Sequence, residues 1–148
     1  ADWHQARAGP ARVFQSLPGP IPSLEKIGLG SNSICNKGAT CLAEALKHNA
    51  VLKHISLWNN HIDVDGAKHL AEGLKANATL KVLDLHNNII GDHGVRHLAE
   101  ALKDSSLAAL DLERNNIGEE GSRYLAEALK ANTPIHLLRV GGRASLRS

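Results

Sequence analysis

LKVLDLHNNIIGDHGVRHLAEALKDSS, residues 80–106, is the stretch that decides the fold of this chain. Leu83 and Leu85 are two residues apart, so they point to one face of a short strand. Leu98 and Leu102 are four residues apart, which is the spacing of one face of a helix. One strand and one helix have no partner layer against which to bury these apolar faces. The stretch therefore predicts neighbouring copies of itself.

Such copies are present on both sides of the stretch, in register with it. Successive units begin at Leu24, Leu52, Leu80 and Leu107, and each reads L-x-x-(L/I)-x-L-x-x-N-x-I-x-x-x-G-x-x-x-L-A-E-(A/G)-L-K. A regular period of this length predicts a repeat protein. The predicted repeats are residues 24–51, 52–79, 80–106 and 107–134, with a partial fifth repeat at 135–140, and together they make one domain over residues 24–140.

Each unit carries an asparagine just after its predicted strand. A side-chain amide can both donate to and accept from backbone groups that a turn leaves unpaired. We therefore expect the stacked asparagines to form a buried hydrogen-bonded ladder: Asn32, Asn60, Asn88 and Asn115. Asn36 and Asp92 stand where helix N-caps are expected.

The order strand, helix, next strand predicts parallel strands joined by right-handed crossovers. Helices are about 10 Å wide and strands are only about 4.8 Å apart, so a stack of both must bend. We expect a right-handed α/β solenoid shaped as a horseshoe, with parallel strands on the concave face and helices on the convex face. Alanines at one helix position are expected to keep neighbouring helices close: Ala43, Ala71, Ala99 and Ala126.

From Leu24 to about Val140 the repeat resembles the ribonuclease-inhibitor-like class of leucine-rich repeats. The units look most like those in the C-terminal repeat regions of NOD-like receptors. Mammalian ribonuclease inhibitor differs, because its repeats alternate between two types and are rich in cysteine, whereas this chain has one repeat type and two cysteines. The resemblance implies a leucine-rich-repeat scaffold for protein–protein interaction, or a regulatory or sensor fragment of a larger NOD-like-receptor-type protein.

Composition narrows the classes of partner. The 148 residues carry a formal charge of +2 with both signs interspersed, which gives no electrostatic case for nucleic acid. No apolar run has the length of a membrane span, and no signal peptide is evident, so we expect no membrane partner and a cytoplasmic location. Two cysteines do not make a disulfide scaffold.

The two ends differ from the repeats. Residues 1–23 are rich in proline and glycine and are expected to form a flexible lead, or alternatively a cap packed by Trp3 and Phe14. The last predicted strand has no polar cap before the tail at 141–148. Because solenoids need capped ends, self-association through the uncapped ends is a further expectation.

Strand residues that face away from the helices are predicted to line the concave face in columns. Trp58 gains nothing from the core there, so it is a candidate binding hot spot, or alternatively a cover for the stems of His86 and Asn87. Asp84 and Asp111 are expected about 5 Å apart on neighbouring strands. The candidate partner-binding residues are Trp58, Asp84, His86, Asp111, Glu113 and Arg114.

The sequence predicts neither an enzyme nor a cofactor. Paired carboxylates could act as general acid and base, but an open sheet offers no enclosed pocket to tune them. No phosphate-binding loop or nucleophile elbow is present. His69 and His97 share one helix position, and His93 and His97 are i, i+4, which leaves metal binding by helix histidines as an alternative. No carboxylate or thiolate completes that set, so no metal site is predicted.

Overall fold

The computed structural model describes residues 24–131 and 133–141. The expectations for residues 1–23, and for all of the tail except Gly141, lie outside these residues. Within them, strands and helices alternate: β1 (Lys26–Gly28), α2 (Cys35–His48), β2 (His54–Ser56), α3 (Val64–Ala76), β3 (Val82–Asp84), α4 (Gly91–Leu102), β4 (Ala109–Asp111), α5 (Glu119–Lys130) and β5 (Leu137–Arg139). No helix in the described part is long and apolar enough to cross a bilayer.

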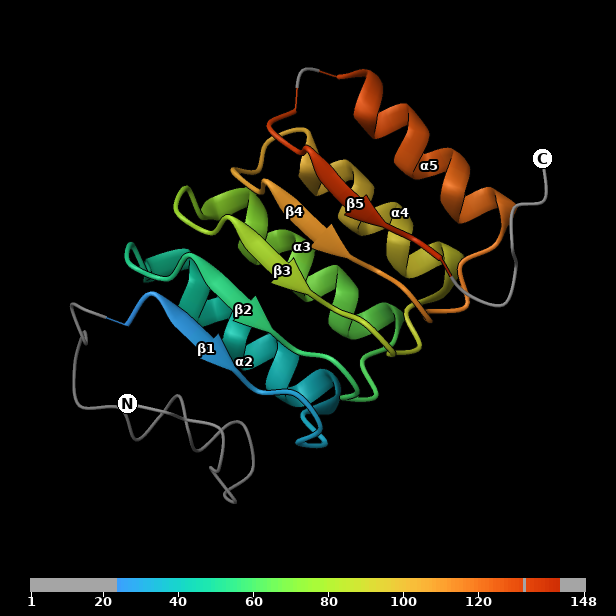
Figure 1. Ribbon diagram of the computed structural model, residues 1–148. Helices are drawn as coiled ribbons and strands as arrows, with labels where there is room; N and C mark the ends of the chain where they lie inside the picture. Colours follow the sequence, from blue (N-terminus) through green and yellow to red (C-terminus); the bar gives the residue numbers. More distant parts are fainter. Residues whose placement is uncertain (1–23, 132, 142–148) are drawn as a thin grey trace.

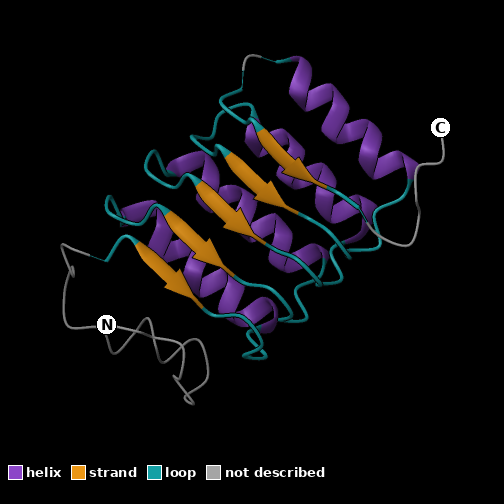
Figure 2. Ribbon diagram, in the orientation of Figure 1, coloured by secondary structure: helices purple, strands orange, loops and turns teal. Residues whose placement is uncertain are grey.

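The strands form one parallel sheet in the order β1-β2-β3-β4-β5, and the helices cover one side of it (Figure 1). The other side carries no secondary structure of the described residues, as Figure 2 shows. Equivalent residues pair across every interface, so that Ile27, Ile55, Leu83, Leu110 and Leu138 form one row. The α/β solenoid predicted from the repeat is confirmed, with strands on the concave face and helices on the convex face.

The core lies between the sheet and the helices. Leu83, Leu85, Leu98 and Leu102 are all at most 1% exposed, and the equivalent residues of the other full repeats, except Leu129, join them in one cluster. The strand period of two and the helix period near four therefore point the leucines of each unit into the same layer.

The asparagine ladder is confirmed. Asn60 Oδ1 accepts hydrogen bonds from the backbone N–H groups of Asn32 and Ile34, each at 3.0 Å. Its Nδ2 donates to the carbonyl oxygen of Leu29 at 2.8 Å. Asn88 repeats this pattern one unit further on. Asn60, Asn88 and Asn115 thus each satisfy backbone groups of the unit before them, which makes the turns of neighbouring units interdependent. Asn32, in the first unit, is half-buried and donates to Gly30 of its own unit.

The prediction that Asn36 and Asp92 cap their own helices is wrong. Helices α2 and α4 begin at Cys35 and Gly91, one residue before Asn36 and Asp92, so these two residues lie inside the helices. Both side chains reach into the following unit. Asn36 Oδ1 accepts from the N–H groups of Asp63 and Gly66, each at 3.1 Å, and Asp92 Oδ1 accepts from Gly118 at 2.7 Å. The first turn of the next helix leaves N–H groups unpaired, and these asparagine and aspartate oxygens satisfy them across the helix interface.

The alanine column packs as expected in three of its four members. Ala43, Ala71 and Ala99 are 2–3% exposed, because a following helix lies against each of them. Ala126 on α5 is exposed, since no described helix packs beyond α5. Small size at this position therefore matters only where a helix follows.

Candidate functional site

The pairing of β2 to β5 brings polar residues together on the concave strand face. Ser56, Asp84, Asp111 and Arg139 are neighbours in one row of the sheet. Glu113 follows Asp111 by two residues, just past the end of β4. We call Asp84, Asp111 and Glu113 the acidic cluster. The structure thus places these three predicted residues side by side.

His86 lies against the acidic cluster. Its Nδ1 is 4.0 Å from Asp111 Oδ1 and 3.8 Å from Glu113 Oε2. On the other side, Arg139 Nη1 is 3.9 Å from Asp111 Oδ2. The side chains of His86, Asp111 and Glu113 are 32%, 23% and 38% exposed, so a partner can still reach each of them. Four of the predicted residues, Asp84 included, therefore form one group.

Backbone hydrogen bonds fix the two aspartates. Asp84 Oδ1 accepts from the N–H of His86, and Asp111 Oδ1 accepts from the N–H of Glu113, both at 3.0 Å. Asp84 Oδ2 also accepts from Ser56 Oγ at 2.8 Å. Each aspartate thus accepts from the backbone N–H two residues further along its own unit. Because successive units repeat this bond, Asp84 and Asp111 stay aligned on neighbouring strands despite the repulsion between their charges.

Trp58 is half-exposed on the same face, at 44% of its surface. Its indole lies over Gly30 of the preceding unit, where a Cβ atom would overlap the ring. The absence of a side chain at position 30 thus makes room for the ring. The indole is supported from one side and open on the other, which is the arrangement of an aromatic anchor.

Arg114, the sixth predicted residue, lies at the end of a second row of equivalent residues, at the edge of the concave strand face. Asn87 Nδ2 donates to Asn59 Oδ1 at 3.1 Å, and Asn59 Nδ2 donates to Ser31 Oγ at 2.9 Å. Arg114 occupies the equivalent place with the same left-handed backbone, at φ 57°. Its N–H donates to the carbonyl oxygen of Gly141 at 3.0 Å, so the backbone is held while the guanidinium is exposed.

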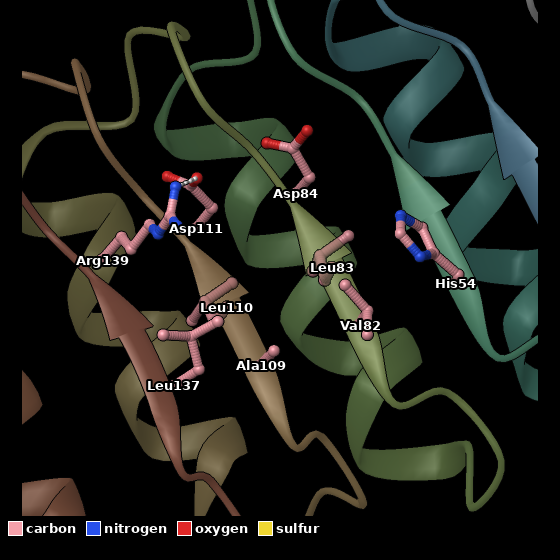
Figure 3. A pocket seen from close by; sticks show the side chains of 9 residues that line it. All are labelled: His54, Val82, Leu83, Asp84, Ala109, Leu110, Asp111, Leu137 and Arg139. Atoms are coloured by element: carbon pink, nitrogen blue, oxygen red, sulfur yellow. Dashed lines mark ion pairs between the residues drawn. The ribbon is translucent and has the colours of Figure 1, made fainter.

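An apolar depression beside the acidic cluster was not among the predicted site residues. Its floor is formed by neighbouring residues of β3, β4 and β5, namely Val82, Ala109 and Leu137, with His54, Asp84, Asp111 and Arg139 at its edges (Figure 3). It encloses about 180 Å³, below the roughly 300 Å³ at which small-molecule sites begin. A signal was available in the sequence, because the first outward position of the strand is apolar in three successive units.

The helix histidines do not assemble a metal-binding group. His69 Nδ1 lies 3.7 Å from Glu72 Oε2 on the exposed side of α3. Over the described residues, the group with three convergent metal-binding side chains is His86, Asp111 and Glu113, on the concave strand face. The helix spacing drew attention to His69, His93 and His97, whereas the strand register brings His86 next to the carboxylates.

Comparison with known proteins agrees with the repeat. The leucine-rich repeat family model matches residues 76–99 and 103–126. Among solved structures, the leiomodin-1 actin-binding site 2 is 27% identical with a TM-score of 0.76, covering 93% of this chain and 79% of that one. The tropomodulin C-terminal domain of Caenorhabditis elegans is 15% identical with a TM-score of 0.78, covering 94% and 86%. A search of curated protein sequences gives no match. The chain carries leucine-rich repeats and has the α/β solenoid fold of these domains.

Proposed function

We propose that this chain is a non-enzymatic scaffold that binds a partner protein on its concave strand face. The contact patch consists of Trp58, Asp84, His86, Asp111, Glu113 and Arg114, together with the apolar depression at Val82, Ala109 and Leu137. The observation that carries the proposal is the gathering of an exposed aromatic residue, an acidic cluster and an apolar depression on one continuous sheet face.

The chemistry of the patch suits a protein surface better than a small ligand. Binding energy in protein interfaces is concentrated in a few aromatic or apolar anchors surrounded by polar residues. Trp58 and Leu137, at 44% and 48% exposed, are anchors of this kind. The depression has room for one apolar side chain of a partner, and Asp84 and Asp111 at its edge favour a basic residue beside it.

Actin is the first candidate partner. The leiomodin-1 structure is described as an actin-binding site, and its identity of 27% extends over most of both chains. Actin binding also fits the cytoplasmic location expected from the sequence. The fold likeness to tropomodulin supports the scaffold but names no partner for this chain.

A Trp58→Ala variant tests the proposal, with Leu129→Ala as a matched control. Leu129 is equally exposed, at 44%, but lies on α5 on the convex side. We expect Trp58→Ala to weaken binding by about 2 kcal/mol, or about 30-fold, because it removes an anchor. Leu129→Ala should leave the affinity unchanged.

The measurement is binding of the purified chain to monomeric and filamentous actin, alongside affinity capture from a cell lysate. Actin binding that Leu129→Ala weakens and Trp58→Ala does not would move the site to the helical side. If neither form of actin binds, actin is excluded, and capture of another protein that depends on Trp58 would still support the concave face.

A second candidate is that this chain is a regulatory or sensor fragment of a larger NOD-like-receptor-type protein. This candidate is based on the resemblance of the repeat motif. One structural observation favours it. Leu129 is exposed on α5 at the end of the described stack, where a further unit or a second copy could pack. Light scattering tests this: a stable monomer at high concentration argues against a missing neighbour.

A further inference from the structure

Three side chains with metal-binding atoms converge at the centre of the concave strand face. They are the imidazole of His86, which follows β3, and the carboxylates of Asp111 and Glu113, at the end of β4. One ligand atom from each lies within 4.8 Å of the other two. We propose that His86, Asp111 and Glu113 bind a zinc ion.

The distances suit a zinc ion after small side-chain rotations. Zinc binds imidazole nitrogen and carboxylate oxygen at about 2.0–2.2 Å in a tetrahedron, so its ligand atoms lie roughly 3.5 Å apart. The His86 nitrogen is 3.8 Å from the Glu113 oxygen and 4.0 Å from the Asp111 oxygen. Three protein ligands leave one position open for water or a partner's side chain.

The identity of the donors selects the class of metal. Two carboxylates alone would suit calcium or magnesium, which prefer oxygen ligands. A neutral imidazole nitrogen in the set favours zinc and its first-row neighbours. The Asp111 side chain is already held by the N–H of Glu113 at 3.0 Å, which limits the reorganisation that coordination requires.

The surrounding charges favour a cation. The acidic cluster carries three carboxylates, and over the described residues Arg139 is the arginine or lysine within ion-pair distance of them, at 3.9 Å from Asp111. A divalent ion between His86, Asp111 and Glu113 would offset the repulsion that the strand register imposes on Asp84 and Asp111.

Isothermal titration of the untagged full chain with zinc tests the proposal, and the visible spectrum of bound cobalt reports tetrahedral coordination. His86→Gln and Glu113→Gln should each weaken binding at least about tenfold, since loss of even an outer-shell partner costs about 10–100-fold. Circular dichroism checks that both variants fold.

Two controls separate coordination from other causes. Asp84→Asn removes one charge from the same face, as Glu113→Gln does, but Asp84 is not a ligand and its amide oxygen can still accept from His86. His93→Gln with His97→Gln removes the imidazole pair on α4. The α4 double variant should bind zinc as the unaltered chain does, and the unaltered chain should bind one ion. Asp84→Asn should weaken binding clearly less than Glu113→Gln does, because it removes a charge but no ligand.

Three results would overturn the site: no heat with the unaltered chain, loss of binding in the α4 double variant alone, or equal losses in Asp84→Asn and Glu113→Gln. The last would show diffuse attraction by the acidic cluster. Because no partner protein is present, the outcome is independent of the test of the proposed scaffold function.

Discussion

Helices α4 and α5 have nearly the same sequence and different surroundings. Residues 94–102 read GVRHLAEAL and residues 121–129 read GSRYLAEAL. Leu102 is 1% exposed in α4, whereas the equivalent Leu129 is 44% exposed in α5. Ala99 is 3% exposed, whereas the equivalent Ala126 is exposed.

The difference arises from the number of neighbours. Helix α4 packs between α3 and α5, while α5 contacts α4 alone among the described helices. The repeat sequence predicts which residues can be buried. Residues at a helix interface become buried only when an adjacent unit packs against them. The same local sequence should therefore tolerate substitution at one end of the stack and not in its middle.

The largest contrast should come from the leucine pair. Leu102→Ala should lower the free energy of unfolding by about 2–5 kcal/mol, because it leaves a cavity between packed helices. Leu129→Ala should change it by less than about 0.5 kcal/mol, as for exposed positions. Urea denaturation followed by circular dichroism measures both. Equal losses would mean that the end of the stack is as tightly packed as its middle.

The asparagine ladder offers the next contrast. Asn88 Oδ1 accepts from two backbone N–H groups at 3.0 Å, while Asn115 Oδ1 accepts from Ile90 alone, at 3.4 Å. Asn88→Ala should cost about 2–4 kcal/mol, since several buried backbone groups lose their partners. Asn115→Ala should cost less. A greater cost for Asn115→Ala in the same denaturation experiment would show that its Nδ2 bonds to Leu85 and Leu112 dominate.

Replacing an alanine by leucine tests the same contrast with a larger side chain instead of a smaller one. Ala99→Leu should destabilise the chain by about 1–3 kcal/mol, because α5 lies against Ala99 and overpacking forces the helices apart. Ala126→Leu should be nearly neutral, as no described helix covers it. Thermal unfolding of the two variants gives the comparison. A stable Ala99→Leu variant would show that the α4–α5 interface can move.

The smallest effect is expected for Lys–Glu ion pairs within one helix, because they do not depend on the neighbouring repeat units. Lys130 donates to Glu127 at 2.8 Å in α5, as Lys47 donates to Glu44 at 2.6 Å in α2. The hydrogen bond and then the charge of the lysine lower the pKa of each glutamate. A carboxyl pKa that is lower in the folded chain adds stability above the unfolded pKa near 4.5, and this stability is lost as the pH falls through the folded pKa.

Lys130→Gln and Lys47→Gln should raise the pKa of Glu127 and Glu44, respectively, towards the ordinary value. Titration followed by NMR measures both values. The free energy of unfolding should change little, because solvent screens ion pairs between exposed side chains. Similar pKa changes in α2 and α5 would show that these pairs are local, whereas the burial of Leu102 and Leu129 is not.

Most of the candidate site could be read from the sequence, although its details could not. The period placed Asp84, Asp111 and Glu113 on one face, since strand register follows directly from the repeat. Asn36 and Asp92 were assigned as caps of their own helices, whereas their side chains bond to the start of the following helix, across the helix interface. The depression at Val82, Ala109 and Leu137 was not predicted as part of the site, because the sequence places these residues on the outward face but does not show that their side chains leave a hollow beside the acidic cluster.

The sequence by itself determined the unit: which residues form a strand, a turn and a helix, and which leucines face inward. It could do so because periodicity is a local property of the chain. Only the tertiary structure decided what each unit meets. Stacking buries Leu102 but not Leu129, turns Asn36 and Asp92 towards the next helix, and brings His86 to Asp111 and Glu113. These outcomes depend on side chains about 28 residues apart, and their contacts form only when neighbouring units pack.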